Sequence, residues 1–318
     1  MCIRDSLTTV NVRPMDSAVI AKAPFSPNLR KSVMFALALS LMVGPGLVLV
    51  ITLLDRRING PEELEALVKA PMLGVIPKAQ DDEAYEPLDL LVHQQPTSSI
   101  AEACRNLRTN LLYAGADHAI KTLVVTSPNE REGKTTASMY LSTVIAQSDQ
   151  KVLLVESDLR RPRLAKANGV PGRRGLADLV LGEISADEAI KTTDVPNLYL
   201  LPAGAPPPNP SELLMTNRFG EVLEELTKRF DMVILDSPPV LAVTDASILA
   251  KRADATLLLV KSEQTLRDTA KRAAEQLATV DAKVAGVVLN GLDLKKRIYG
   301  YYTKYGYGYG YAPEPAES

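Results

Sequence analysis

The chain has 318 residues and a formal net charge of −2, and its composition is 46% hydrophobic and 23% charged. This length accommodates one sizeable α/β domain and a smaller region, and the near-neutral charge gives no reason to expect nucleic acid as a partner. The two cysteines, Cys2 and Cys104, do not suggest a disulfide framework.

The first predicted element is an uncharged apolar segment, Val33 to Leu54. Its length suffices to span a bilayer, which takes about 20 residues, and Pro45 in its middle would kink the helix. One alternative is a secretory signal, although the segment starts too deep in the chain and is too long for one. The other alternative is a buried core helix. We assign residues 32–54 to a transmembrane helix and residues 1–31 to an extracytoplasmic region.

Residues 55–97 are predicted to form a juxtamembrane linker. Within this linker, Pro61 to Lys69 has the pattern of a short helix with proline in its first turn, and Met72 to Ile76 is compatible with a strand. A serine at position 98 or 99 then caps a helix over residues 100–114.

Charged residues recur every three positions on that helix, at Glu102, Arg105 and Arg108. This spacing places them on one face of the helix. A solvated face is one interpretation of the pattern. A docking surface for another subunit is the alternative.

The stretch from Ser127 to Thr136 predicts a phosphate-binding loop between a strand and a helix. Loop N–H groups and the helix N-terminus would face the anion, Lys134 would add a positive charge, and the hydroxyl of Thr135 would ligate Mg²⁺. Pro128 stands where the usual pattern has glycine. The predicted ATP-binding residues are Glu130, Arg131, Glu132, Gly133, Lys134, Thr135 and Thr136.

Two apolar runs lead into carboxylates, 152–155 before Asp158 and 232–235 before Asp236. Such runs are typical of buried strands in a parallel sheet, and ligands bind at the carboxyl ends of these strands. We therefore expect Asp158 and Asp236 to hold Mg²⁺ together with Thr135. The alternative is that each carboxylate caps the helix that follows it.

Strand and helix patterns alternate through residues 98–292, which predicts an α/β fold of the P-loop NTPase type. We expect a parallel sheet with helices on both faces and right-handed crossovers. The predicted strands are 121–126, 151–155, 198–201, 232–235, 256–260 and 284–289. The predicted helices are 136–147, 175–181, 186–192, 211–229, 245–251 and 266–280.

Residues 293–318 are predicted to be a disordered tail in which tyrosines alternate with glycines, since glycine disfavours a stable helix. Of the 11 tyrosines in the chain, the tail holds Tyr299, Tyr301, Tyr302, Tyr305, Tyr307, Tyr309 and Tyr311. One interpretation is a low-complexity segment that stacks or aggregates. The other is a multi-site phosphoacceptor, in which each phosphate would add about −1.5 to −2 charges.

Taken in order, these motifs resemble the bacterial tyrosine kinase (BY-kinase) family, the cytoplasmic autokinases of membrane polysaccharide co-polymerases. Residues 133–135 are similar to the family's Walker A motif, 156–160 to its Walker A′ motif and 236–239 to its Walker B motif. The spaced charges at 102, 105 and 108 match its oligomerisation motif, and the tyrosines match its autophosphorylated tail. Glu156 departs from the family pattern, which normally has Asp there.

The resemblance implies an ATP- and Mg²⁺-dependent autokinase in the bacterial inner membrane, with residues after Arg57 in the cytoplasm. Lys134, Asp158, Asp236 and Arg160 would be catalytic, with Asp158 accepting the tyrosine proton; for Arg160, a structural ion pair is an equal alternative. Neighbouring subunits of a homo-oligomeric ring would phosphorylate each other's tails. The implied partners are the polysaccharide polymerase and export machinery, a cognate tyrosine phosphatase and the membrane.

Family members of the single-chain type carry a first membrane helix and a large periplasmic domain, so we expect this sequence to be a fragment. One rival interpretation is a partition- or division-type P-loop ATPase. The other is a non-catalytic scaffold whose nucleotide site only controls assembly. Incubation with Mg²⁺-ATP separates the three, because only the kinase forms phosphotyrosine.

Overall fold

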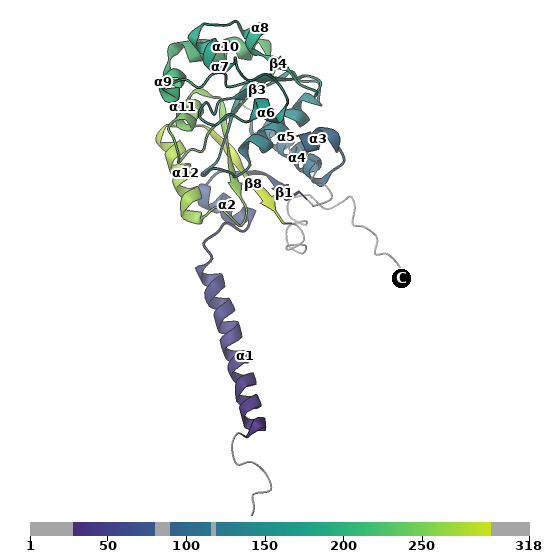
Figure 1. The fold of residues 1–318 in the computed structure, drawn as a ribbon, viewed down its shortest axis with the longest axis vertical. Helices are drawn as coiled ribbons and strands as arrows, with labels where there is room; N and C mark the ends of the chain where they lie inside the picture. The colour runs from purple at the N-terminus through teal and green to yellow at the C-terminus, as the bar shows by residue number, and fades with distance from the viewer. Residues whose placement is uncertain (1–27, 80–89, 116–118, 294–318) are drawn as a thin grey trace, which may run out of the picture. The chain divides into compact units, whose positions relative to one another are not determined.

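The computed structural model describes residues 28–79, 90–115 and 119–293. The predicted tyrosine tail and most of the predicted extracytoplasmic region therefore lie outside the described residues. The chain divides into two units, Met1–Asp55 and Arg56–Ser318, and each is described by itself (Figure 1).

The first unit contains a long apolar helix, α1, Leu29–Leu54. It begins a few residues before the predicted segment and includes Pro45. The span Arg30–Val50 is long and apolar enough to cross a membrane, and none of it is buried against other parts of the chain. This exposure disfavours the alternative of a core helix.

The described part of the second unit is built on one eight-stranded sheet with the order β1-β8-β7-β2-β6-β3-β5-β4. The strands are β1 Met72–Pro77, β2 Thr122–Thr126, β3 Val152–Glu156, β4 Lys191–Thr192, β5 Leu198–Leu201, β6 Met232–Asp236, β7 Ala255–Lys261 and β8 Val284–Leu292. All pairings are parallel except that of β4 with β5. The predicted parallel sheet is confirmed, but residues 191–192, predicted to be helical, form an antiparallel edge strand instead.

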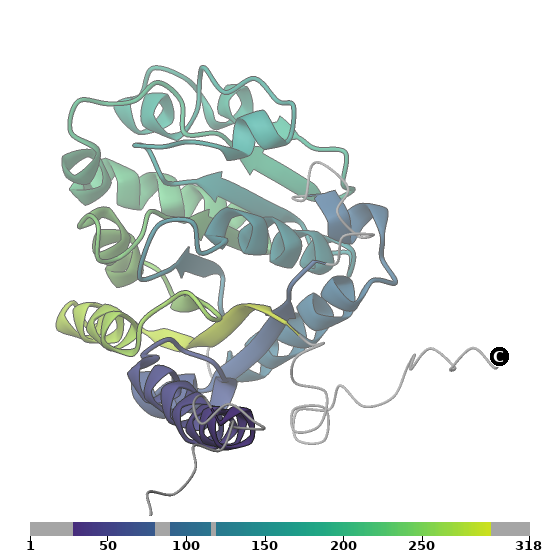
Figure 2. The same ribbon diagram turned by 60° about the horizontal axis from the view of Figure 1, so that its bottom comes forward.

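Helices cover both faces of this sheet, and in Figure 2 the blue and teal helices of residues 99–146 lie on one side and the green helices of residues 217–279 on the other. They are α2 Pro61–Val68, α3 Leu91–Gln94, α4 Ser99–Ala114, α5 Lys134–Ala146, α6 Leu164–Ala167, α7 Leu176–Leu181, α8 Ala186–Ala189, α9 Pro210–Met215, α10 Asn217–Arg229, α11 Asp245–Arg252 and α12 Arg267–Thr279. Side chains alternate along each strand, so in β2 Leu123 belongs to the buried cluster that contains residues of α4 and α5, while Val124 belongs to the cluster that contains residues of α7 and α10. Every residue of β2, β3 and β6 is consequently buried.

The prediction that residues 55–97 form a linker is wrong, because its described residues 56–79 and 90–97 belong to the folded unit. Strand β1 pairs in parallel with β8, with Gly74 opposite Val288, and α2 packs beside α12 and β1. Leu73 and Ile76 of β1 enter the hydrophobic core. The sequence hid this pairing because more than 200 residues separate the two strands.

The single helix predicted over residues 211–229 is two helices, α9 and α10. Thr216 separates them with an extended backbone, and its hydroxyl accepts a hydrogen bond from Phe219 N at 3.1 Å. Threonine at such a position is an ordinary N-cap. The break turns α10 so that Phe219, Val222 and Leu226 are buried.

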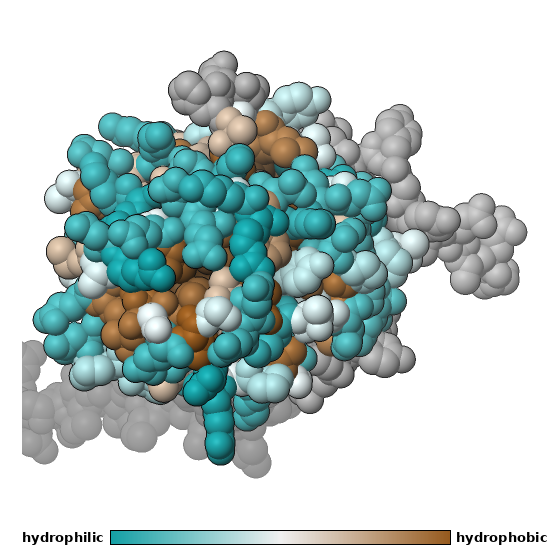
Figure 3. Space-filling model, turned by 90° about the horizontal axis from the view of Figure 1, so that it is seen from above, coloured by the Kyte–Doolittle hydropathy of each residue, from teal (hydrophilic) through white to brown (hydrophobic). Residues whose placement is uncertain are grey.

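The surface of the second unit is mostly hydrophilic on the face seen in Figure 3, with a hydrophobic area among the charged side chains. In the described part of this unit, the exposed large apolar side chains are Leu112, Tyr113, Leu181, Met215 and Leu266. They come from three helices and from the residue before α12 rather than from one helix face. Isolated exposed apolar residues of this kind need no partner.

Candidate active site

The phosphate loop, residues 127–133, connects β2 to α5 at the carboxyl edge of the sheet. Gly133 has a φ of +94°, and a Cβ there would lie 2.3 Å from Asn290 Nδ2. Asn290 Nδ2 in turn donates a hydrogen bond to the carbonyl oxygen of Glu132 at 2.8 Å. The loop therefore needs glycine at position 133 both for backbone conformation and for the close approach of β8.

Lys134 is the first residue of α5, and only 8% of it is exposed. Burial lowers the pKa of Lys134, and the charges of Asp236 and Glu132 oppose that lowering. A cation at a helix N-terminus suits an anionic ligand that also accepts hydrogen bonds from the backbone amides. This geometry agrees with the predicted phosphate-binding role of Lys134.

Asp236 ends β6, between β2 and β3, and is 2% exposed. Thr135 Oγ1 donates a hydrogen bond to Asp236 Oδ2 at 2.8 Å, and Ser138 Oγ donates one to Oδ1 at 3.3 Å. Burial raises the pKa of Asp236 to about 7, opposed by the hydrogen bond from Thr135 and the charge of Lys134. The structure thus joins two predicted metal ligands and adds Ser138, which lies one helical turn beyond Lys134 and was not predicted.

Glu156 ends β3 and lies opposite Asp236 in the sheet, but the hydrogen bonds of its side chain go to residues outside the phosphate loop. Its carboxylate accepts hydrogen bonds from the backbone N–H groups of Arg163 and Leu164, at the start of α6, and of Ala203. Burial raises the pKa of Glu156, and these hydrogen bonds oppose the rise. The longer side chain at this Walker A′ position therefore caps the start of α6, which is the kind of role that was the alternative for Asp158 and Asp236.

Asp158 follows Glu156 at the carboxyl edge and is partly exposed. Its Oδ1 accepts hydrogen bonds from the backbone N–H of Arg160 at 3.2 Å and of Arg161 at 3.0 Å. The charge of Asp158 also contributes to the electrostatics of both Lys134 and Asp236. Asp158 is therefore brought into the same site as the other predicted catalytic residues.

Arg160 forms a hydrogen-bonded ion pair with Asp245, a residue that sequence reasoning missed. Its Nε lies 2.8 Å from Asp245 Oδ2, and its Nη2 lies 3.1 Å from Oδ1 and 3.0 Å from Ser211 Oγ. Ser211 also donates a hydrogen bond to Asp245. Burial raises the pKa of Asp245, but the hydrogen bonds from Arg160 and Ser211 outweigh burial and lower it overall. The structure thus shows Arg160 in the ion-pair arrangement that was the alternative to a catalytic role.

The remaining predicted loop residues differ in exposure. Glu130 forms an exposed ion pair with Arg161, which ties the phosphate loop to the Walker A′ loop, residues 158–161. The side chain of Glu132 is fully buried and faces the protein interior, so this residue can offer the nucleotide only its backbone. Arg131 has a φ of 62°, which turns the loop, and Thr136 lies partly buried in the first turn of α5.

The predicted oligomerisation motif on α4 makes contacts within the chain. Arg105 pairs with Glu102, with Nη2 2.7 Å from Oε2, and Nη2 also donates to the carbonyl oxygen of Pro96 at 2.8 Å. Arg108 Nη1 donates to the carbonyl oxygen of Val144 near the end of α5 at 2.7 Å. Both arginines are partly buried, so the motif is not the uniformly solvated face that was one interpretation.

The donor set suits a magnesium nucleotide. In the described part of the chain, no group of three or more His, Cys, Asp or Glu side chains could hold a metal by itself. Mg²⁺ at phosphoryl-transfer sites usually takes one or two protein carboxylates and completes its shell with water and substrate phosphates. The Thr135 hydroxyl beside the buried Asp236 carboxylate, with Asp158 in the same site, fits that requirement.

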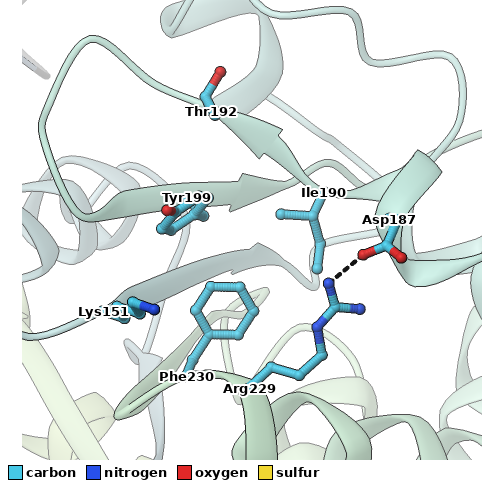
Figure 4. Close-up of a pocket in the computed structure, with 7 residues that line it drawn as sticks. All are labelled: Lys151, Asp187, Ile190, Thr192, Tyr199, Arg229 and Phe230. Atoms are coloured by element: carbon cyan, nitrogen blue, oxygen red, sulfur yellow. Dashed lines mark hydrogen bonds and ion pairs between the residues drawn. The ribbon is translucent and has the colours of Figure 1, made fainter.

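A pocket of about 290 Å³ lies away from these residues (Figure 4). It is lined by Lys151, Asp187, Ile190, Thr192, Tyr199, Arg229 and Phe230. Lys151 and Phe230 precede β3 and β6, so the pocket lies at the amino edge of the sheet, opposite the phosphate loop. None of the predicted site residues lines it.

Comparison with known proteins now decides the family. A model of the AAA domain matches residues 122–285. The putative tyrosine-protein kinase CapB of Staphylococcus aureus is 34% identical over 217 residues, which cover 68% of this chain and 95% of CapB. The tyrosine-protein kinase YwqD of Bacillus subtilis is 38% identical over 215 residues, covering 67% of this chain and 91% of YwqD. The kinase domain of the Escherichia coli tyrosine kinase ETK superposes with a TM-score of 0.70 at 31% identity, covering 80% of this chain and all of that domain.

The chain belongs to the bacterial tyrosine kinases. It is therefore an enzyme of the tyrosine-protein kinase class, as the resemblance implied, and the partition-type ATPase was the wrong alternative. Other kinases of the family are much longer, and the chain spans between 40% and 44% of their length.

Proposed function

We propose that the chain transfers the γ-phosphoryl group of Mg²⁺-ATP to tyrosines in its own C-terminal tail. The observation that carries this proposal is that Lys134, Thr135, Asp158 and Asp236 gather at the carboxyl edge of the sheet. Strand β8 ends at the same edge, two strands from β2, or about 10 Å away at ordinary strand spacing. The chain leaves the sheet there and enters the tyrosine-rich segment.

The phosphate loop binds the polyphosphate in this proposal. Lys134 and the N–H groups at the start of α5 contact the phosphate oxygens. Thr135 and Asp236, with Asp158, hold Mg²⁺ directly or through water. When bound, the ion neutralises charge on the phosphates and helps to align them. The buried carboxylate of Asp236 already accepts hydrogen bonds from two hydroxyl groups, which hold it in place. Little reorganisation of this carboxylate therefore accompanies the binding of Mg²⁺.

Asp158 accepts the proton of the attacking tyrosine. The phenol has an ordinary pKa of about 10, so its oxygen must lose a proton as it forms the bond to phosphorus. The proton moves to the Asp158 carboxylate, the bond from phosphorus to the bridging oxygen of ATP breaks, and ADP leaves. Arg160 holds the backbone of this loop by its ion pair with Asp245.

A neighbouring copy supplies the tyrosines in the proposed assembly. From Asp293 to Tyr311 is 18 residues, and a fully extended segment of that length reaches about 60 Å. A homo-oligomeric ring formed through Glu102, Arg105 and Arg108 would bring each tail to the next site. Multiple phosphates on each tail would then repel one another and loosen the ring.

The cell membrane is the proposed location, with α1 as the single transmembrane helix and the kinase unit in the cytoplasm, where ATP is found. Support for this location comes from the length and exposure of α1, and support for the role below comes from a longer relative that is named a putative tyrosine-protein kinase in the cps region. The proposed role is control of exopolysaccharide or capsule polymerisation and export. Partners would be that machinery and a tyrosine phosphatase.

One assay tests the reaction. The full chain in detergent micelles is incubated with Mg²⁺-ATP and examined for phosphotyrosine by mass spectrometry. Phosphotyrosine in the tail supports the proposal. Free phosphate without phosphotyrosine, or neither product, contradicts it, and the latter would revive the non-catalytic scaffold.

A second assay tests transfer between copies. A tagged Lys134→Met chain is mixed with an active chain in which all seven tail tyrosines are replaced by phenylalanine. Transfer between copies puts phosphotyrosine on the tagged chain. An unlabelled tagged chain, beside an active wild-type control that labels itself, would show that each tail serves its own site.

A further inference from the structure

The phosphate loop contains a carboxylate that points away from its ligand side. Glu132 directly precedes Gly133 and Lys134, yet it is 0% exposed. Its Oε2 accepts a hydrogen bond from Asn129 N at 3.1 Å, and its Oε1 accepts one from Asn129 Nδ2 at 3.0 Å and one from Thr265 Oγ1 at 2.7 Å. Burying a carboxylate costs free energy unless hydrogen bonds compensate. The position of this side chain is therefore set by its hydrogen-bond partners within the protein.

Among these hydrogen-bond partners of Glu132, Thr265 is distant in the sequence, 133 residues further along the chain. It lies between β7 and α12 and is 1% exposed. Lys261 N donates to Thr265 Oγ1 at 3.1 Å, so one lone pair of this hydroxyl is occupied. A hydroxyl has a single proton, and the geometry directs that proton at Glu132. The backbone of Thr265 is fixed as well, because its carbonyl oxygen accepts a hydrogen bond from Ile58 N at 2.9 Å.

Glu132 is also held through its backbone. Arg131 before it and Gly133 after it both have positive φ, at 62° and 94°. The Glu132 carbonyl oxygen accepts a hydrogen bond from Asn290 Nδ2 at 2.8 Å. Glu132 lies between two residues of left-handed backbone, and it is held at its carboxylate by the loop between β7 and α12 and at its carbonyl by β8. These contacts fix the direction of the backbone N–H groups that follow Glu132 in the phosphate loop.

We infer that Glu132 and Thr265 form a positioning pair that shapes the phosphate loop before nucleotide arrives. Neither side chain touches the ligand in this account, which rests on the proposed binding of nucleotide by the loop. Removing the pair leaves a loop that must be ordered when the nucleotide binds, and that cost weakens affinity. The charge of Glu132 also opposes the lowering of the Lys134 and Lys261 pKa values that burial causes.

The test compares a variant that keeps the shape of threonine with one that keeps its hydroxyl. Thr265→Val removes the hydroxyl but keeps the shape, whereas Thr265→Ser keeps the hydroxyl. Thr256→Val is the matched control, because Thr256 in β7 is 0% exposed and its Oγ1 has no hydrogen-bond partner in the described part of the chain. Binding of a fluorescent ADP analogue to the full chain is measured together with KM for ATP and kcat.

We expect Thr265→Val to weaken ADP binding and raise KM by about tenfold, the loss typical of a hydrogen bond to a charged group, with kcat changing less. Thr265→Ser should bind within about twofold of wild type, and Thr256→Val should match wild type. Equal ADP affinity for Thr265→Val and Thr256→Val would overturn the inference.

Hydrogen exchange of the nucleotide-free chain gives a readout that does not depend on activity. Amides of residues 129–134 should exchange at least about tenfold faster in Thr265→Val, while those of β2 and β6 keep their protection. Unchanged exchange of residues 129–134 would overturn the inference. This arm also separates the two proposals, because a chain that makes no phosphotyrosine can still show the loss of protection in its loop.

Glu132→Gln is the second variant and covers the case in which Thr265→Val folds poorly. Glutamine places an NH₂ group where one carboxylate oxygen now accepts from Asn129 or Thr265. The expected result is the same local loss of protection and the same rise in KM. A Glu132→Gln chain with wild-type exchange and wild-type KM would overturn the inference by itself.

Discussion

The phosphate loop and the Walker A′ loop follow the two strands that flank β6, but they are held in different ways. The phosphate loop is fixed by buried groups, among them Glu132 and Lys134. The Walker A′ loop depends on arginines that reach solvent, since the side chain of Arg160 is 40% exposed and that of Arg161 is 71% exposed. The nucleotide side of the site is thus preformed, whereas the side that must admit a tyrosine rests on accessible contacts.

On the nucleotide side of the site, the largest effect is expected for Asp236→Asn. The pKa of Asp236 is about 7 in the fold, against an ordinary value of 3.8. A raised acid pKa means that the folded state keeps a proton that the unfolded state releases, so this group destabilises the metal-free protein progressively as pH rises from about 4 to 7.

At pH 8 the asparagine variant should therefore be more stable than wild type by as much as about 4 kcal/mol, and at pH 4 the gain should vanish. Urea unfolding of the nucleotide-free chain at both pH values measures this difference. Phosphotyrosine formation should be lost at the same time. A variant that is less stable than wild type at pH 8 would contradict the account of Asp236.

Lys134→Met tests the same region through binding. Methionine fills a similar volume in this buried position, so the fold should persist while the charge that meets the phosphates is gone. Phosphotyrosine formation should fall on the order of 10²–10³-fold or more. Lys121→Met, at an exposed lysine before β2, is the control and should keep wild-type activity. Autophosphorylation of purified Lys134→Met chain would contradict the proposed role.

The comparison between the two loops also explains what the sequence could and could not predict. Lys134, Thr135, Asp158 and Asp236 could be predicted because each belongs to a local pattern: an apolar run, a turn and a polar residue. Their convergence follows from parallel strands sharing one carboxyl edge. Local chemistry and topology were enough to predict that these side chains lie at one edge of the sheet.

Long-range partners could not be predicted in this way. Asp245 looked like an ordinary residue at a helix start, and its partner Arg160 is 85 residues away. Glu132 looked like a loop residue facing the nucleotide, because nothing local reveals the hydroxyl of Thr265. Arg108 looked solvated for the same reason, although its partner is a carbonyl group near the end of α5. The spacing of side chains along the sequence does not show which distant residues the tertiary fold places beside them.

Asp245→Asn breaks the main anchor of the Walker A′ loop. Asp245 is 0% exposed, and the variant loses the charge-assisted hydrogen bonds from Arg160. We expect a loss of about 1–3 kcal/mol in the free energy of unfolding, with a lower kcat and nearly unchanged ADP affinity. Asp281→Asn is the matched control, since Asp281 forms an exposed ion pair with Lys251 and asparagine tolerates its φ of 51°. A Kd for ADP that rises as much as kcat falls would show that the two loops are not held independently.

The smallest effect is expected where the two loops touch, at the exposed ion pair between Glu130 and Arg161. Exposed pairs contribute about 0.2–1 kcal/mol, because water screens the charges and two long side chains must be ordered. A double-mutant cycle with Glu130→Ala and Arg161→Ala, read as ADP affinity, should give a coupling energy in that range at low salt. The coupling should disappear in about 1 M NaCl, where the screening length is near 3 Å.

The pair of Glu224 and Lys228 on α10, both well exposed, provides a control cycle in which ADP affinity stays constant. A coupling above about 2 kcal/mol that survives high salt would mean that this contact is dry when nucleotide is bound, and that the Walker A′ loop closes over the site instead of remaining open to the incoming tyrosine.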